Sequence, residues 1–248
     1  MPGLTHIFRH PIKAVGLESL AETQLQTGKT VQGDRIWAVM HDASKYDPAE
    51  GWGRCMNFMR GVSSHQLMAV RATLADDTVT LTHPDRPPIT LNPDDAGDAA
   101  KLIEWIEPIR NTDRAAPSQV VRATRQGMTD NSSPYISILS GASLDDLSTK
   151  CGKPLARERF RGNLWIDGTP PWQEFDWMGQ CLRIGDAVLE VRERITRCRA
   201  TTVDPITGRS DVETLQVLDD NWGHRDFGLL ALVTNGGTIR VGDKVDLL

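Results

Sequence analysis

The chain has 248 residues, of which 39% are hydrophobic and 25% are charged, so it is long enough for one or two globular domains with a buried core. Its 28 basic and 33 acidic residues give a net charge of −5, which argues against a nucleic-acid-binding protein. No apolar run approaches the length of about 18 residues that a membrane helix needs, and the N-terminus lacks an apolar signal core. We therefore expect a cytoplasmic protein that binds neither nucleic acid nor membrane.

Short strands and turn signals dominate the sequence, taken in chain order. The expected strands are Leu4–Arg9, Arg35–Met40, Gln66–Leu74, Thr78–Thr82, Val120–Ala123, Ile136–Leu139, Asn163–Ile166, Ala187–Val191, Leu229–Thr234, Thr238–Val241 and Lys244–Leu247. Hairpin turns are predicted at Ala75–Asp77 and Asn235–Gly237. Helices are predicted at Asp98–Ile106, from an N-cap at Ser143 to Gly152, and at Val212–Leu218. This pattern predicts a mainly β protein, a β-barrel-rich α+β fold.

Two irregular segments interrupt these elements. The long loop Asp42–Ser64 carries Trp52 and several glycines, and loops of this length are usually functional or mobile. The polar segment Asn111–Ser118 is the expected boundary between an N-terminal region, residues 1–113, and a C-terminal domain, residues 114–248.

The segment Arg192–Gly208 carries the strongest chemical signal. Four arginines lie close to Cys198 in this segment, namely Arg192, Arg194, Arg197 and Arg199. Cationic neighbours favour the thiolate, which is the form that binds metals or attacks electrophiles. On the residues alone, a buried structural cysteine on a strand and a Cys–His nucleophile with His224 as base remain open as alternatives. The residues Asp204–Gly208 predict a tight turn.

The sequence lacks the common signatures of several other sites. Its four cysteines, Cys55, Cys151, Cys181 and Cys198, are widely and irregularly spaced, so zinc ribbons, haem attachment and the usual iron–sulfur patterns are unsupported. No G-x-G-x-x-G or G-x-x-x-x-G-K-[ST] motif for a nucleotide occurs.

Five segments in order resemble the MOSC proteins, which are named for the C-terminal domain of molybdenum cofactor sulfurase. These segments are Phe8–Lys13, Asp34–Trp37, Arg159–Asn163, Arg197–Gly208 and Gly237–Asp243. The chain is most similar to the branch of the mitochondrial amidoxime-reducing component and its bacterial counterparts, from about Leu4 to Leu248. The resemblance implies a MOSC N-terminal β-barrel region at residues 1–113 and a MOSC domain at residues 114–248.

The same resemblance implies a site for the molybdenum cofactor (Mo-molybdopterin), a pterin that carries molybdenum and ends in a phosphate. Cys198 matches the family's metal ligand, and a soft thiolate suits such a metal. The basic cofactor-binding positions are matched by Lys13, Arg35, Arg161 and Arg197, and arginine suits bidentate contact with phosphate. Neighbouring polar positions are matched by Asn163, Thr196, Ser132 and Ser133, the two serines with an offset of about one residue. Ala14 stands where relatives often carry serine.

The resemblance implies a molybdenum-dependent oxidoreductase that reduces N-hydroxylated compounds, with Cys198 as the catalytic metal ligand. Its substrates would be hydroxylamines, amidoximes and N-hydroxylated bases, in a detoxification role. Electrons would come from a separate redox protein of ferredoxin, flavoprotein or cytochrome b5 type, and pyridoxal phosphate is not expected. The alternatives are a carrier or maturation protein for the cofactor or its sulfur, and a Cys-dependent hydrolase that needs no metal.

Overall fold

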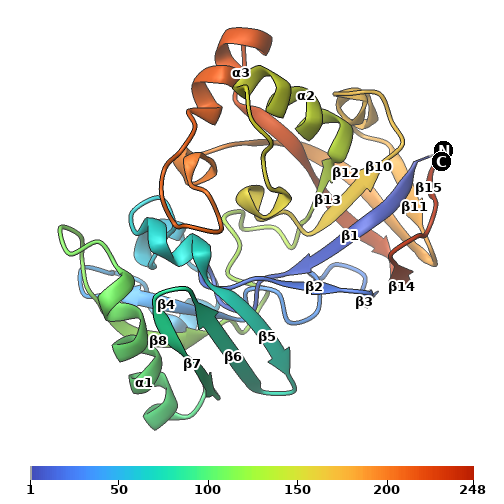
Figure 1. Cartoon of the computed structure of the whole chain (residues 1–248). Helices are drawn as coiled ribbons and strands as arrows, with labels where there is room; N and C mark the ends of the chain where they lie inside the picture. The colour runs from blue at the N-terminus through green and yellow to red at the C-terminus, as the bar shows by residue number, and fades with distance from the viewer. Residues whose placement is uncertain (1) are drawn as a thin grey trace.

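The structure, a computed structural model, describes residues 2–248, and most of its regular elements are β-strands (Figure 1). The strands are β1 (Gly3–Arg9), β2 (Glu18–Leu20), β3 (Glu22–Leu25), β4 (Trp37–His41), β5 (Arg71–Ala75), β6 (Thr78–His83), β7 (Arg86–Leu91), β8 (Pro117–Arg122), β9 (Ile136–Ser140), β10 (Leu164–Asp167), β11 (Cys181–Ile184), β12 (Ala187–Thr196), β13 (Asp226–Asn235), β14 (Gly237–Arg240) and β15 (Val245–Leu247). The α-helices are α1 (Ala96–Ile106), α2 (Gly141–Cys151) and α3 (Thr214–Trp222). The short 3₁₀ helices are η1 (Pro48–Glu50), η2 (Cys55–Asn57), η3 (His65–Ala69), η4 (Glu107–Ile109), η5 (Arg157–Phe160), η6 (Gln173–Trp177) and η7 (Arg199–Thr202). The predicted mainly β class is confirmed.

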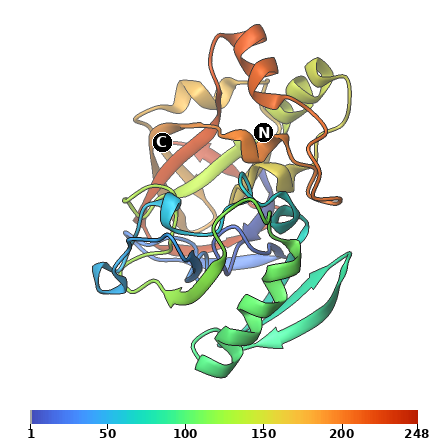
Figure 2. The ribbon, with the colours of Figure 1, turned by 90° about the vertical axis from the view of Figure 1, so that its left-hand side faces the viewer.

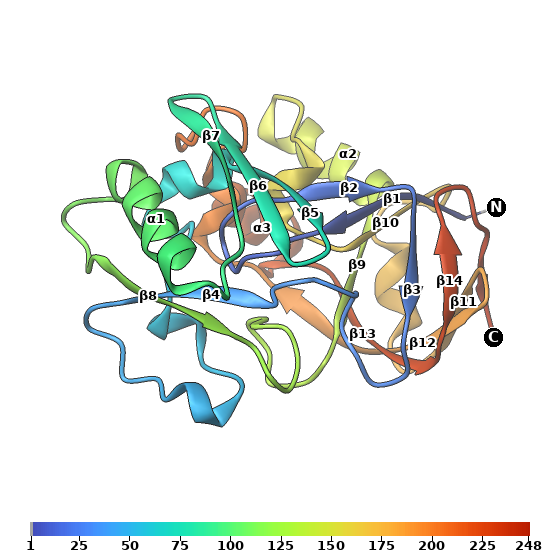
Figure 3. The ribbon, with the colours of Figure 1, turned by 90° about the horizontal axis from the view of Figure 1, so that it is seen from below.

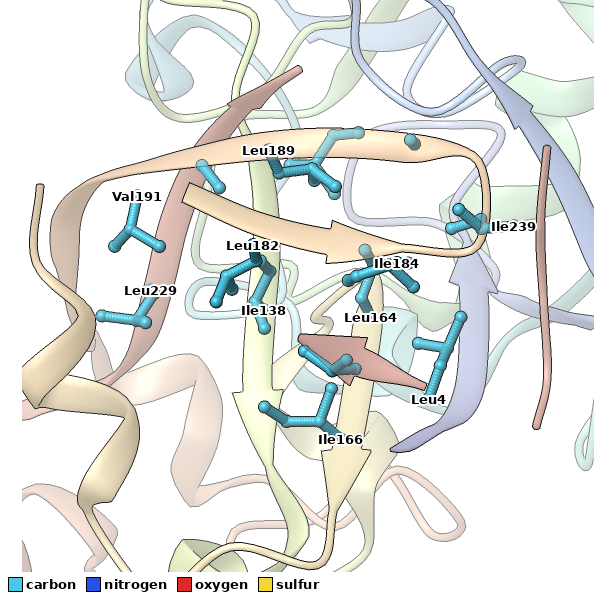
Figure 4. Packing of buried hydrophobic residues seen from close by; sticks show 14 of the residues in the cluster. Leu4, Ile138, Leu164, Ile166, Leu182, Ile184, Leu189, Val191, Leu229 and Ile239 are labelled. Atoms are coloured by element: carbon cyan, nitrogen blue, oxygen red, sulfur yellow. The ribbon is translucent and has the colours of Figure 1, made fainter. Parts of the chain in front are cut away.

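One curled sheet of eight strands encloses the main core, with the strand order β15-β11-β12-β13-β9-β10-β1-β2. All its neighbouring strands are antiparallel except β9 and β10, which are parallel. In β12, Ala187, Leu189 and Val191 are buried because alternate side chains of a strand point to the same face. These residues pack against Leu182 and Leu229 from neighbouring strands (Figure 4).

The first strands of the chain are part of the structure built by its last half. β1 pairs with β10, and Leu4 and Ile7 of β1 are fully buried in the main core. β3 pairs with β14, and the two lie side by side next to the large sheet (Figure 3). The sheet therefore contains strands from both sides of the predicted boundary, and the division into residues 1–113 and 114–248 stays a prediction.

A second core lies between the three-stranded sheet β5-β6-β7, helix α1 and the pair β4–β8 (Figure 2). Trp37 of β4, Leu81 of β6 and Leu102 of α1 are fully buried there. Helix α1 begins after Asp95, whose carboxylate accepts hydrogen bonds from the backbone N–H groups of Gly97 and Asp98. Among residues 2–248, no helix is long and apolar enough to cross a membrane.

Several predicted element boundaries are wrong, for local reasons. The strand predicted from Gln66 begins only at Arg71, because His65–Ala69 form the 3₁₀ helix η3. The strand predicted from Arg35 begins at Trp37, because the backbone of Arg35 is left-handed with φ +53°. The N-cap of α2 is Ser140 and not Ser143, and the last helix extends to Trp222.

The predicted hairpin turn at Ala75–Asp77 is confirmed, but Asn235–Gly237 does not form one. Strand β14, which follows Asn235–Gly237, pairs with β3 and not with β13. This pairing places Ile239 of β14 in the main core. The sequence also gave no signal for β2, β3, β7 and β11. β7 contains two prolines, which a strand tolerates because it lies at the edge of its sheet.

Candidate functional site

Four basic side chains from distant parts of the chain come together beside β1 and β10. A guanidinium N–H of Arg35 donates to the carbonyl oxygen of Arg161 at 3.0 Å, and Arg161 donates to the carbonyl of Gly16. Burial lowers the pKa values of Lys13 and Arg197, and the positive charge of Arg35 lowers both further. We call Lys13, Arg35, Arg161 and Arg197 the basic cluster.

Left-handed backbone conformations are concentrated at this cluster. Five residues other than glycine have positive φ in residues 2–248, and three of them are Ala14 (60°), Arg35 (53°) and Arg161 (47°). Each such residue costs free energy, and such strain tends to occur at functional sites. Here the left-handed conformation turns the chain sharply at Arg35 and at Arg161, whose side chains belong to the basic cluster.

A buried pair, His10 and Asp34, holds Arg35 in place. One carboxylate oxygen of Asp34 lies 3.0 Å from Nδ1 of His10 and 2.7 Å from its backbone nitrogen, and the other accepts from Arg35. Burial, together with the charges of Arg35 and Arg161, lowers the pKa of His10 to about 3, so the imidazole is neutral. Burial works against ionisation of Asp34, but Arg35 and His10 hold the pKa of its carboxyl well below the usual range.

The cluster carries more positive than negative charge. Burial and neighbouring cations lower the pKa of Arg161 to about 9 and that of Arg197 to about 9. Burial also lowers the pKa of Lys13, although Asp130, 2.5 Å from its Nζ, acts in the other direction. Since buried like charges disfavour one another, a bound anion would relieve this cost.

One buried nitrogen atom of the cluster has no hydrogen-bond partner among residues 2–248. Nε of Arg197 donates to the carbonyl of Phe227 at 2.7 Å and Nη1 donates to that of Phe160 at 3.0 Å. Nη2 is buried and has no hydrogen-bond partner within the described part of the chain. A Cβ atom at Gly228 would lie 3.2 Å from this nitrogen, so the glycine leaves space beside it. A buried polar group without a partner costs free energy, which an anionic ligand here would recover.

Cys198 follows Arg197 directly and is exposed, beyond the end of β12. Burial lowers the pKa of Arg197, and the negative charge of a Cys198 thiolate acts in the opposite direction with a smaller effect. The alternative of a buried structural cysteine on a strand is therefore wrong. His224 packs against Trp172 and Phe175, and within residues 2–248 no hydrogen bond joins it to Cys198. The structure thus gives no support to a Cys–His nucleophile.

The other predicted site residues are engaged within the protein to different degrees. Asn163 is buried: its Oδ1 accepts from Ser137, and its Nδ2 donates to the carbonyl of Phe8. The hydroxyl of Thr196 donates to Asp226 at 2.6 Å. Ser132 is exposed, whereas the backbone N–H of Ser133 donates to the side chain of Asn131. Their cofactor contacts stay predictions. The predicted turn at Asp204–Gly208 is confirmed, with Gly208 donating to the carbonyl of Asp204.

Sequence reasoning missed the residues that support the basic cluster. His10 and Asp34 lie inside two of the segments singled out for their basic residues, so a signal was present. Asp130 lies in a loop more than a hundred residues after Lys13 and accepts a hydrogen bond from its Nζ. No local sequence pattern indicates this contact. Gly228 also carried no signal, because only the packed structure brings Arg197 beside it.

The family model for the MOSC N-terminal beta barrel domain matches residues 1–129, and the MOSC domain model matches residues 126–246. Mitochondrial amidoxime-reducing component 1 of Mus musculus is 29% identical over 99% of this chain and 82% of its own length. Its Homo sapiens counterpart is 38% identical over 48% of this chain and 38% of its own length. Molybdenum cofactor sulfurase of Caenorhabditis elegans is 25% identical over 94% of this chain and 34% of its own length.

Proposed function

The chain belongs to the MOSC family, and we propose that it binds the molybdenum cofactor at the basic cluster and reduces N-hydroxylated compounds. The observation that carries the proposal is the buried, unpartnered Nη2 of Arg197 next to the exposed thiol of Cys198. The relatives named for amidoxime reduction and for the molybdenum cofactor support the same reading.

The residues present fit the cofactor's chemistry. Arg197, Arg35, Arg161 and Lys13 would hold its anionic groups, and the thiolate of Cys198 would ligate the metal. When bound, the cofactor supplies the two-electron couple that removes the oxygen of an N–OH group. Fixed cations need no rearrangement to receive an anion, and Asp34 and the carbonyl of Arg161 already fix the guanidinium of Arg35.

The exposure of Cys198 would give a substrate access to a metal bound there. Because this thiol is open to solvent, a metal bound to it would be reachable by a small N-hydroxylated molecule. The two electrons of each turnover come, in this proposal, from a separate electron-transfer protein.

The direct test is turnover of benzamidoxime by protein made in a host that synthesises the cofactor. Three electron sources are compared: NADH alone, a chemically reduced viologen dye, and a reductase with a small electron carrier. We expect benzamidine to form with the second and third sources only. Robust turnover with NADH alone, or none with reduced dye despite full molybdenum loading, would contradict the proposal.

The same exposed thiol favours one second candidate, a carrier of the cofactor or its sulfur. An accessible Cys198 could pass its cargo to another protein, and the similarity to molybdenum cofactor sulfurase spans 94% of the chain. Incubation of loaded protein with a molybdenum-free apo-enzyme separates the two functions. A reductase keeps its molybdenum and turns over, whereas a carrier activates the apo-enzyme and does not.

A further inference from the structure

A cavity of about 560 Å³ opens beside the long loop Asp42–Ser64. It is lined by Glu50, Trp52, Arg125, Gln126 and Ser132. Pockets for small molecules usually enclose roughly 300–1,000 Å³, so this cavity has the size of a substrate site.

The cavity adjoins the basic cluster through one short segment of chain. The indole N–H of Trp52 donates to the carbonyl of Thr129 at 3.2 Å, and the next residue, Asp130, pairs with Lys13. Two residues further on, Ser132 lines the cavity. Thr129 and Asp130 therefore connect the wall of the cavity to Lys13 of the basic cluster.

Trp52 is held in the cavity wall by a hydrogen bond and by packing. Its indole N–H donates to the carbonyl of Thr129 at 3.2 Å, and its partly buried side chain packs against the core cluster around Phe58. The next residue, Gly53, lies so close to Tyr46 that a Cβ atom there would be 2.6 Å from the tyrosine ring. These contacts keep an aromatic side chain in the wall.

The charges at the cavity do not select a ligand by its sign. Glu50 and Arg125 are both exposed and have opposite charges, so they offset one another. A flat aromatic surface instead favours planar ligands, because stacking adds to the burial of apolar area. Shape and planarity are therefore the properties that this cavity can distinguish.

We propose that Trp52 makes the cavity selective for planar N-hydroxylated substrates, such as aryl amidoximes and N-hydroxylated heteroaromatic bases, over saturated substrates of similar size. The inference rests on the proposed reductase function and names its substrate class. Trp52 is a specificity-determining residue here, and it takes no part in the chemical step.

The kinetic test compares benzamidoxime with cyclohexanecarboxamidoxime, which share the reacting group and differ in the planarity of the ring. Trp52→Leu keeps an apolar side chain but removes the flat surface, whereas Trp52→Phe keeps the surface. We expect the ratio of the two KM values to change by about 5- to 10-fold in Trp52→Leu, with kcat little altered, and to be largely retained in Trp52→Phe. Met56→Ala, on the same loop but 60% exposed and outside the cavity lining, is the matched control.

A binding measurement separates this inference from the proposed function. Benzamidine and cyclohexanecarboxamidine carry the same cationic group, and their dissociation constants are measured by NMR titration of loaded wild-type protein and Trp52→Leu. Tighter binding of benzamidine that is lost in Trp52→Leu supports the cavity assignment even if no N–OH compound is reduced. Equal binding of both, or a preference unchanged in Trp52→Leu, overturns it even if wild-type turnover is fast.

Discussion

Each cation of the basic cluster donates hydrogen bonds to oxygen atoms of the protein itself. The carbonyl acceptors are those of Met128 for Lys13, Arg161 for Arg35, Gly16 for Arg161, and Phe227 and Phe160 for Arg197. A binding site whose groups are already oriented loses less conformational entropy when its ligand arrives. This fixed arrangement costs folding free energy in two ways. The backbone at Arg35 and Arg161 is left-handed, and several like charges are buried close together.

At the residue scale, Cys198→Ala tests the proposed metal ligand. Because the side chain is exposed, the change should alter the free energy of unfolding by less than about 0.5 kcal/mol, while molybdenum content and N-reduction are lost. Chemical denaturation and metal analysis measure the two effects. Cys181→Ala in β11 is the control, whereas Cys55 is unsuitable because it lies close enough to Lys13 to affect its pKa. Undiminished metal content in a folded Cys198→Ala protein would remove the proposed ligand.

The second residue-scale prediction concerns His10 and pH. Its pKa falls from 6.5 when unfolded to about 3 when folded, so between these values the unfolded chain binds a proton that the folded protein excludes. Stability from this group is therefore fully present above pH 6.5 and is lost as the pH falls, by at most about 2 kcal/mol between pH 6.5 and 5. His10→Asn removes the titrating group, so its free energy of unfolding should depend less on pH.

Urea denaturation at pH 7 and pH 5 measures this difference. His6 and His83, whose pKa values burial also lowers, remain in both proteins, so the comparison isolates His10. The same loss of stability in wild type and His10→Asn would show that His10 is protonated normally in the fold.

At the scale of elements, the sequence indicated those strands whose apolar pattern is complete within a few residues. β1, β6, β9 and β13 are examples, because each buries alternate or consecutive apolar residues that are recognisable locally. β3 and β14 depend on each other across more than two hundred residues, and only their packing decides that Asn235–Gly237 is no hairpin. The same limit applies to the site: the basic residues were predicted from the resemblance to the MOSC proteins, but Asp130, Gly228 and the cavity at Trp52 arise from contacts between distant segments.

Gly228→Ala tests whether β13 must leave space for Arg197. A Cβ atom there would lie 2.8 Å from Cγ of Leu139 and 3.2 Å from Nη2 of Arg197, at φ +83°. We expect a loss of stability of about 2 kcal/mol or more and weaker retention of the pterin, since the guanidinium must move.

The matched control is Gly223→Ala at the end of α3, where φ is +71° and nothing lies within 4 Å of the added atom. In this variant an alanine in the left-handed conformation lowers the free energy of unfolding by about 1 kcal/mol, without a steric contact. The variant should therefore keep its pterin. Equal pterin retention in both alanine variants would show that the space beside Arg197 is not needed.

At the scale of the whole molecule, the two regions of the chain share one main sheet. β1 and β2 occupy one edge of the eight-stranded sheet, and the chain's two ends meet where the backbone N–H of Val245 donates to the carbonyl of Pro2. The basic cluster spans the same junction, since Lys13 and Arg35 precede the predicted boundary and Arg161 and Arg197 follow it. Neither predicted region contains all four residues of the basic cluster.

A fragment of residues 114–248 should therefore fail to fold on its own. It lacks β1, which covers the edge of β10 with the buried Leu4 and Ile7, and β3, which pairs with β14. We expect no cooperative thermal transition in the fragment, against a single sharp transition in the full chain, measured by circular dichroism and differential scanning calorimetry. A cooperative transition in the fragment would establish it as an independent domain.

The central claim is that the basic cluster and Cys198 together hold the molybdenum cofactor. The most direct measurement is the molybdenum and pterin content of the chain purified from a host that makes the cofactor. We predict molybdenum and pterin equimolar with the protein in the wild type. Both should be strongly reduced in Arg161→Ala, which removes one of the buried cations. A wild-type protein that is folded and free of both molybdenum and pterin, or an Arg161→Ala variant loaded as fully as the wild type, would contradict the claim.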